Sequence, residues 1–160
     1  MALFAIKDVD SALDVVQDAM LDFVRLYRHL PVGEWPPLFF RVVQSRITDA
    51  HRRRNVRNRI MSWLGRDRQD GETDDLIENL PDPGGINPLQ SMERRALGTA
   101  LEKAIGSLPL RQQQAFLLRS WEGLDVSETA RAMGCSDGSV KTHHFRAVQA
   151  LRKQLEEFEP

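Results

Sequence analysis

The segment from Asp125 to about Phe158 constrains the fold most, because its capping and turn residues suit two helices joined by a tight turn. Asp125 can cap a helix whose third residue, Glu128, can reach back to the cap. Gly134 can adopt the left-handed backbone conformation that such a turn requires. Ser136 can then cap the second helix. A tight helical pair is therefore predicted over residues 126–158.

Two further residues make this pair a helix-turn-helix. Ala130 is small where the two helices must cross closely, and Gly134 follows four residues later. Val140 comes six residues after Gly134 and is expected to point into the core. A small residue, a glycine and a branched apolar residue at these offsets are what a helix-turn-helix needs.

A helix-turn-helix places the first turns of its second helix in the major groove of DNA. The residues on or near the outward face of that helix are Ser139, Lys141, Thr142, Phe145 and Arg146. Lysine and arginine contact guanine edges or phosphates, threonine hydrogen-bonds, and phenylalanine touches a thymine methyl. The alternative is a plain helical hairpin on which Lys141 and Arg146 are solvated charges.

The rest of the chain also predicts helices, over about residues 10–29, from 36–37 to 59, 89–108 and 110–121. No strand alternation and no internal repeat is found, so the fold class is all-α. In the first helix one apolar stripe is formed by Leu13, Val16, Met20, Leu21 and Val24. Its polar side carries Asp14, Gln17 and Asp18, and the second helix has a buried side made by Phe39, Phe40, Val42, Val43 and Ile47.

The formal net charge of −1 hides a segregation of charge along the chain. Residues 41–68 are dominated by arginine, whereas residues 70–93 carry acidic residues and no lysine or arginine. Two such blocks indicate separate surfaces with separate partners. Residues 65–88 are also rich in glycine and proline, which predicts an acidic linker. The linker divides the chain into two small helical domains, residues 1–64 and 89–160.

Several other classes of protein are disfavoured. No apolar run approaches the roughly 20 residues that span a bilayer, and no secretory signal opens the chain. Cys135 is the single cysteine, so no internal disulfide forms, as is typical of the cytoplasm. No phosphate-binding glycine loop is present, and the histidines do not form a metal site with carboxylates; they are His29, His51, His143 and His144. We therefore expect no enzyme, no cofactor and no metal.

Residues 107–151 resemble region 4 of the extracytoplasmic-function (ECF, group IV) sigma factors. In that family a leucine-proline start, a helix with glutamine and phenylalanine and a Trp-Glu-Gly turn precede the helix-turn-helix. The same order is present here as SLPLRQQQAFLLRSWEGLDVSETARAMGCSDGSVKTHHFRAVQAL. The resemblance implies that the outward residues of the second helix recognise the −35 element.

The N-terminal module resembles region 2 of the same family. SALDVVQDAMLDFVR is similar to the helix that docks on the β′ subunit of RNA polymerase, which implies core contacts by Asp14, Gln17, Asp18 and Leu21. LFFRVVQSRITDAHRRR is similar to the promoter-melting helix. For that helix the resemblance implies contacts to the −10 element by Arg41, Ser45, Arg46, Arg52, Arg53 and Arg54. A run as dense as Arg52 to Arg54 also repels itself without a counter-anion, which favours phosphate contact.

The resemblance further implies a sigma factor whose partners are the β′ and β subunits of core polymerase, promoter DNA and an anti-sigma protein. The chain departs from the family pattern at Leu38, Ser45 and His144, where tryptophan, asparagine and an aliphatic residue are usual, and the first region 2 helix is largely missing. For His144 a hydrogen-bonded core histidine is expected. The linker, by its acidity, either mimics nucleic acid in the polymerase or only tethers the modules.

Three alternatives stay open. One is a helix-turn-helix regulator that binds DNA without polymerase. Another is a degenerate sigma-like protein that keeps its protein contacts but cannot initiate. An enzyme such as a nuclease has little support, because no catalytic or metal cluster is visible.

Overall fold

The computed structural model describes residues 1–63 and 88–156, and within these ranges every regular element is a helix, as predicted. The α-helices are α1 (Ala2–Ile6), α2 (Val9–Tyr27), α3 (Trp35–Trp63), α4 (Pro88–Ser107), α5 (Leu110–Phe116), α6 (Val126–Met133) and α7 (Asp137–Gln154). A 3₁₀ turn, η1 (Val32–Glu34), joins α2 to α3, and a π-helical turn, η2 (Leu117–Trp121), continues α5. The predicted linker lies, except for Pro88, outside the described residues. None of the described helices is long and apolar enough to cross a membrane.

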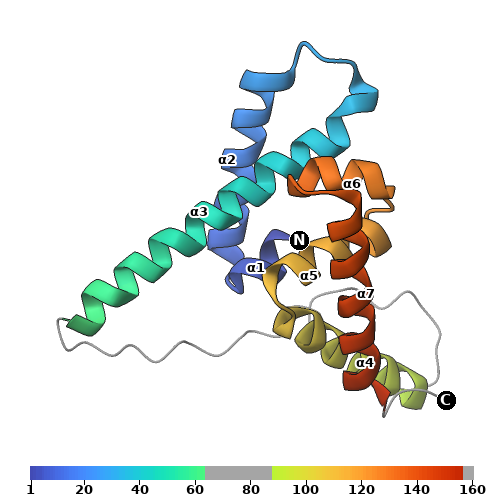
Figure 1. Ribbon diagram of the computed structural model, residues 1–160. Coiled ribbons are helices and arrows are strands. Elements are labelled where there is room, and N and C mark those ends of the chain that lie inside the picture. The colour runs from blue at the N-terminus through green and yellow to red at the C-terminus, as the bar shows by residue number, and fades with distance from the viewer. Residues whose placement is uncertain (64–87, 157–160) are drawn as a thin grey trace.

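The N-terminal module is built on α2 and α3, which cross one another (Figure 1). Asp8 caps α2 by accepting a hydrogen bond from the Ser11 amide at 2.8 Å. At the other end the indole of Trp35 donates to the Leu30 carbonyl at 2.9 Å, which closes the connection to α3. The ring of Phe23 lies 5.6 Å from that of Phe39 in an edge-to-face arrangement, a favourable geometry for aromatic pairs. These contacts fix the angle between the start of α3 and the end of α2.

The face of α2 that packs is not the apolar stripe found in the sequence. Ala12, Val15, Ala19 and Phe23 are buried. Of the stripe only Val16 packs against the core, and the side chains of Leu13, Met20, Leu21 and Val24 are 53–63 % exposed. The small side chains of Ala12 and Ala19 pack in one cluster with residues of α1 and α3, whereas Phe23 packs against rings of α3. The apolar stripe is therefore, apart from Val16, not the core face of α2.

The C-terminal module is formed by α4 to α7. Leu118, Ala130 and Val140 belong to one buried cluster between α5, α6 and α7. Ile105 and Ala147 belong to a second cluster, between α4 and α7. The guanidinium of Arg119 donates to the Leu124 carbonyl and holds the loop before α6. The first cluster thus holds α6 and α7 against α5, and the second holds α7 against α4.

The two modules pack against each other, with α3 along α6 (Figure 1). Phe40 of α3 packs against the buried cluster of the helix-turn-helix, whereas its neighbour Phe39 packs in the N-terminal module. The two phenylalanines were expected on the buried side of this helix, and both are half-buried there. We call the contact between α3 and α6 the seam, and Phe40 joins the two modules across it.

Helix α1, which the sequence did not predict, lies in the middle of the molecule and contacts α2, α3 and α4 (Figure 1). Ile6 is buried in the N-terminal module, while Phe4 packs against the cluster of the C-terminal module that contains Ile105. The amide of Gln113 donates to the Phe4 carbonyl at 3.4 Å and to the Ile105 carbonyl at 3.0 Å. The first residues of the chain thus belong to both modules.

Candidate nucleic-acid interface

The turn of the helix-turn-helix has the predicted capping geometry. The Asp125 carboxylate accepts from the Glu128 amide at 2.7 Å, and the Glu128 carboxylate accepts from the Asp125 amide at 2.9 Å. Gly134 follows α6 with φ 62° and ψ 43°, and the next amide, of Cys135, donates to the Ala130 carbonyl at 3.1 Å. This reciprocal capping and left-handed termination confirm the prediction from the sequence.

We expect Gly134→Ala to lower the free energy of unfolding by about 1–2 kcal/mol. The cost arises because a residue with a Cβ is strained in the left-handed backbone conformation that Gly134 adopts. That Cβ would meet no atom within 4 Å, so no clash adds to the cost. Gly33→Ala is the matched control, since its Cβ is equally uncrowded and Gly33 has no positive φ. Urea denaturation measures both, and equal losses of stability in the two variants would contradict the assignment.

Helix α7 begins with a cap from Ser136, whose hydroxyl accepts from the Ser139 amide at 3.2 Å. Lys141, Thr142, Phe145 and Arg146 are exposed, and Ser139 is half-buried. Phe145 is 63 % exposed, so its ring is available for contact with a partner. The structure thus brings all the predicted recognition residues to the first turns of α7, on its outer side.

His144 lies on the inner side of α7, half-buried. Its Nε2 lies 2.9 Å from the hydroxyl of Ser120, and its ring stacks on that of Phe116 at 6.3 Å. Burial, and secondly the charge of Arg119, lower the pKa of His144 below its ordinary value. The neutral imidazole is therefore favoured in the fold, and its contribution to stability is lost as the pH falls through the ordinary range of histidine. The expected hydrogen bond is present, but His144 is half-buried beside the core and is not a core residue.

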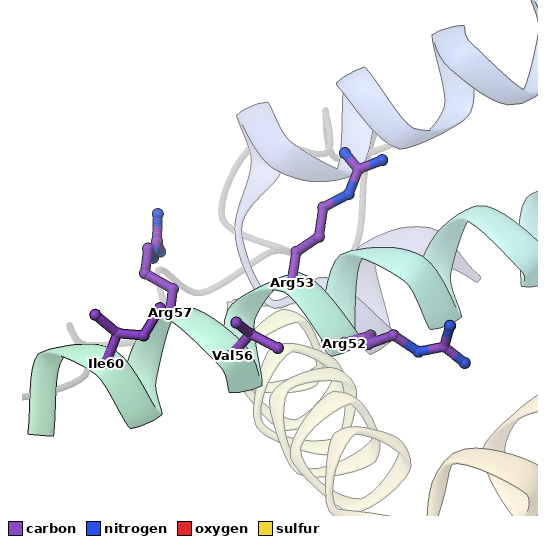
Figure 2. A pocket seen from close by; sticks show the side chains of 5 residues that line it. All are labelled: Arg52, Arg53, Val56, Arg57 and Ile60. Atoms are coloured by element: carbon purple, nitrogen blue, oxygen red, sulfur yellow. The ribbon is translucent and has the colours of Figure 1, made fainter. Parts of the chain in front are cut away.

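The second half of α3 projects from the rest of the molecule and carries the arginine run (Figure 1). Arg52, Arg53 and Arg54 are exposed there. Arg52, Arg53 and Arg57 line an open pocket of about 400 Å³ together with the apolar Val56 and Ile60. Figure 2 shows these five side chains extending from α3. Val56 and Ile60 are each 53 % exposed and were missed from the sequence, although their spacing of four among arginines was visible. This surface combines phosphate-binding groups with apolar ones.

The first half of α3 carries the other predicted −10 residues, and these differ in environment. Arg41 and Ser45 are exposed beside the seam. Arg46 is half-buried and bonds through Nε to the Asp22 carboxylate at 2.7 Å, with an ion pair through a second nitrogen. The bond to Asp22 raises the pKa of Arg46 above its ordinary value. The charge of Arg46 is thus balanced by Asp22 within the module. An arginine that binds phosphate would instead have its charge unpaired in the free protein.

The four residues predicted to dock on polymerase share the outer side of α2. Asp14, Gln17, Asp18 and Leu21 are all exposed and follow one another at spacings of three, one and three, which keeps them on neighbouring turns. Leu21 is 54 % exposed and lies beside the exposed apolar side chains of Met20 and Val24. Among the described residues no group of three or more histidine, cysteine or acidic side chains is placed to hold a metal ion.

Comparisons with known proteins relate the chain to sigma factors. Residues 98–151 match the family model described as Sigma-70, region 4. An RNA polymerase sigma-E factor from Streptomyces avermitilis is 32 % identical over 152 residues, which are 94 % of this chain and 74 % of that protein. The RNA polymerase sigma factor SigV of Bacillus subtilis is 27 % identical over 155 residues, 97 % of this chain and 82 % of that protein.

A solved structure shares the fold over both modules. It is the sigma factor RpoE in a co-crystal with the anti-sigma factor NepR from Bartonella quintana. The TM-score is 0.68 at 21 % sequence identity, and the likeness covers 97 % of this chain and 89 % of that one.

Proposed function

Because the chain belongs to the extracytoplasmic-function family of RNA polymerase sigma factors, we propose that its two modules divide promoter recognition between α7 and α3. The observation that carries the proposal is the presence, in one chain, of a capped helix-turn-helix and a separate, projecting arginine-rich helix. A regulator that reads duplex DNA alone needs only the first of these. We also propose that the chain acts in the cytoplasm, with the polymerase.

Helix α7 is proposed to read the −35 element as intact duplex. Lys141 and Arg146 lie on its exposed face with Thr142 and Phe145. The hydroxyl of Thr142 donates to the Gly138 carbonyl at 3.0 Å, so toward DNA it acts through its remaining acceptor capacity and its methyl group. The side chains of Lys141 and Arg146 carry the donors that match guanine edges.

Helix α3 is proposed to hold the −10 element after strand separation. Arg52, Arg53 and Arg54 would track the phosphates of the captured strand, together with Arg41 and Ser45 nearer the seam. Val56 and Ile60 offer unstacked bases an apolar surface between the guanidinium groups, as single-strand binding surfaces do. Arg46 is proposed to support this helix through Asp22 rather than to bind DNA directly.

The outer side of α2 is proposed to bind core polymerase. Two carboxylates, Asp14 and Asp18, flank an exposed Leu21 and the amide of Gln17, a combination that gives an apolar contact with charged edges. Interfaces with such a composition gain specificity from the charges and affinity from the apolar centre. An anti-sigma protein is proposed as a further partner, competing for these surfaces.

Run-off transcription with purified core polymerase tests the proposal. We expect the chain to direct transcription from a cognate promoter, and to bind that promoter weakly without core. Equally tight binding with and without core would favour a regulator that acts without polymerase. Association with core without any transcript would favour the degenerate sigma-like alternative.

We expect Arg146→Ala to weaken promoter binding by the holoenzyme by about 1–3 kcal/mol if the residue reads a base. Fluorescence anisotropy on promoters with and without the −35 element measures the loss, which should disappear when the element is absent. Lys153→Ala is the control, because Lys153 lies in the last turn of the same helix, away from the proposed base contacts. An unchanged affinity for the intact promoter would refute the role of Arg146.

A further inference from the structure

A polar cleft of about 240 Å³ opens at the seam between the modules. Helix α3 contributes one wall, and α5 and the end of α6 contribute the other. Its lining consists of Arg41, Gln44, Ser45, Thr48, Arg111, Gln114, Ala132, Met133 and Gly134. Because the walls come from both modules, the cleft exists only while the modules are packed together.

The described lining of the cleft carries positive charge. Arg41 and Arg111 line it from opposite modules, and there is no carboxylate among the described residues that line it. Within the part of the chain that the structure describes, neither arginine forms an ion pair. Arg111 uses one nitrogen to donate to the Met133 carbonyl at 2.8 Å, which leaves further N–H donors on its guanidinium. Both side chains are exposed, so their charges are open to an anion from solvent.

Two buried amides in the same cleft have unmet hydrogen-bonding capacity. Gln44 is 5 % exposed and Gln114 is 2 % exposed. The Gln44 Nε2 donor and the Gln114 Oε1 acceptor have no hydrogen-bond partner among the described residues. Buried polar atoms of this kind are normally satisfied, and both belong to side chains that line the cleft, so each lacks a partner that a ligand or water at the cleft can supply.

We propose that this cleft binds a compact phosphate-bearing small molecule, whose oxygens bridge Arg41 of one module and Arg111 of the other. Guanidinium groups match phosphate oxygens in geometry, Gln44 supplies a further donor, and a protonated phosphate oxygen satisfies Gln114. The cleft is smaller than the roughly 300–1,000 Å³ pockets that take drug-sized ligands, which limits the ligand to a compact group. The ligand binds only the closed form and therefore stabilises it. Arg41 and Ser45 are then occupied at the seam; that consequence for the −10 element, unlike the site itself, rests on the proposed function.

Isothermal titration calorimetry of the full chain with inorganic pyrophosphate, at constant ionic strength, tests the site. We expect one site per chain, weakened at least tenfold by Arg41→Gln and by Arg111→Gln. Ser45→Glu, which places a carboxylate on the exposed rim, should abolish binding without removing any contact of the fold. Arg131→Gln, on the exposed side of α6, and the pair Arg52→Gln with Arg53→Gln should leave the affinity unchanged.

Two further experiments test whether binding needs the packed modules and whether the bound phosphate belongs to DNA. Phe40→Ala should weaken pyrophosphate binding because it loosens the seam, whereas Phe39→Ala should not. Saturation with a non-promoter duplex should leave pyrophosphate bound; displacement by the duplex, with weaker duplex binding in Arg111→Gln, would assign the phosphate to the DNA backbone and overturn the proposal. Absence of binding at millimolar pyrophosphate, or equal weakening by Arg131→Gln, would show that only water or diffuse counter-ions occupy the cleft.

Discussion

Replacing Arg52 and Arg53 by alanine should weaken binding of the holoenzyme to DNA of every sequence and flatten its dependence on salt. Each lost phosphate contact reduces the slope of log K against log salt concentration by about 0.9 for duplex and about 0.7 for a single strand, so two contacts remove about 1.4–1.8. Both side chains are exposed on the projecting end of α3, so the folded module should be unaffected. Anisotropy titrations over a range of salt concentrations give the slope.

The matched control removes two positive charges elsewhere on the same module. Arg25 and Arg28, at the C-terminal end of α2, are exposed, and the change in net charge on replacing them is identical. This control variant should keep the salt slope of the wild type, because diffuse charge contributes less than direct contact with phosphates. Equal slopes in the two variants would show that Arg52 and Arg53 touch no phosphate.

We expect Phe40→Ala to uncouple the two modules. A fully buried phenylalanine costs about 3–5 kcal/mol on truncation to alanine, so the half-buried Phe40 should cost about 2 kcal/mol, from its contacts across the seam and from its edge-to-face contact with Phe39. The wild-type chain should unfold in one cooperative transition, since the modules share buried contacts. The variant should unfold in two, followed by circular dichroism and by tryptophan fluorescence.

Phe39→Ala is the control for this experiment, because it changes the same residue type one position away. Phe39 packs against Phe23 inside the N-terminal module, with ring centroids 5.6 Å apart. Its truncation should lower stability while the single transition is kept. Two transitions in the Phe39 variant, or one in the Phe40 variant, would mean that the seam is held by other contacts.

The helix-turn-helix could be predicted from the sequence because its determinants are local. The capping of α6 by Asp125 and Glu128 involves residues three apart, and Gly134 fixes the turn by its own backbone. Ala130 and Val140 are buried as predicted, at 6 % and 0 % exposed. Over so short a range, residue type and spacing almost determine the geometry. The DNA and polymerase contacts of the site residues remain predictions.

The packing of α2 could not be predicted in the same way. A hydrophobic pattern favours the largest apolar side chains as the core face, which here are Leu13 and Met20. The true core face is built on Ala12 and Ala19, which pack in one cluster with residues of α1 and α3. That packing depends on other helices and leaves little trace in the pattern of α2 itself.

Helix α1 and the seam were invisible in the sequence for a related reason. A helix of five residues is too short to be stable alone, so α1 owes its form to the two modules between which it lies. The contact of Phe40 with α6 joins residues about ninety positions apart. The spacing of residues along the chain predicts periodic faces, and it does not reveal which distant face they meet.

The position of Met1 has a practical consequence for anyone who purifies this protein. Its side chain packs against all three buried clusters, so residues joined ahead of it would begin beside the contact between the two modules. We expect an affinity tag fused there to weaken the contact between the two modules. Measurements on tagged protein would then overestimate how readily the modules separate. A tag at the opposite end, or one cleaved completely before measurement, avoids that artefact.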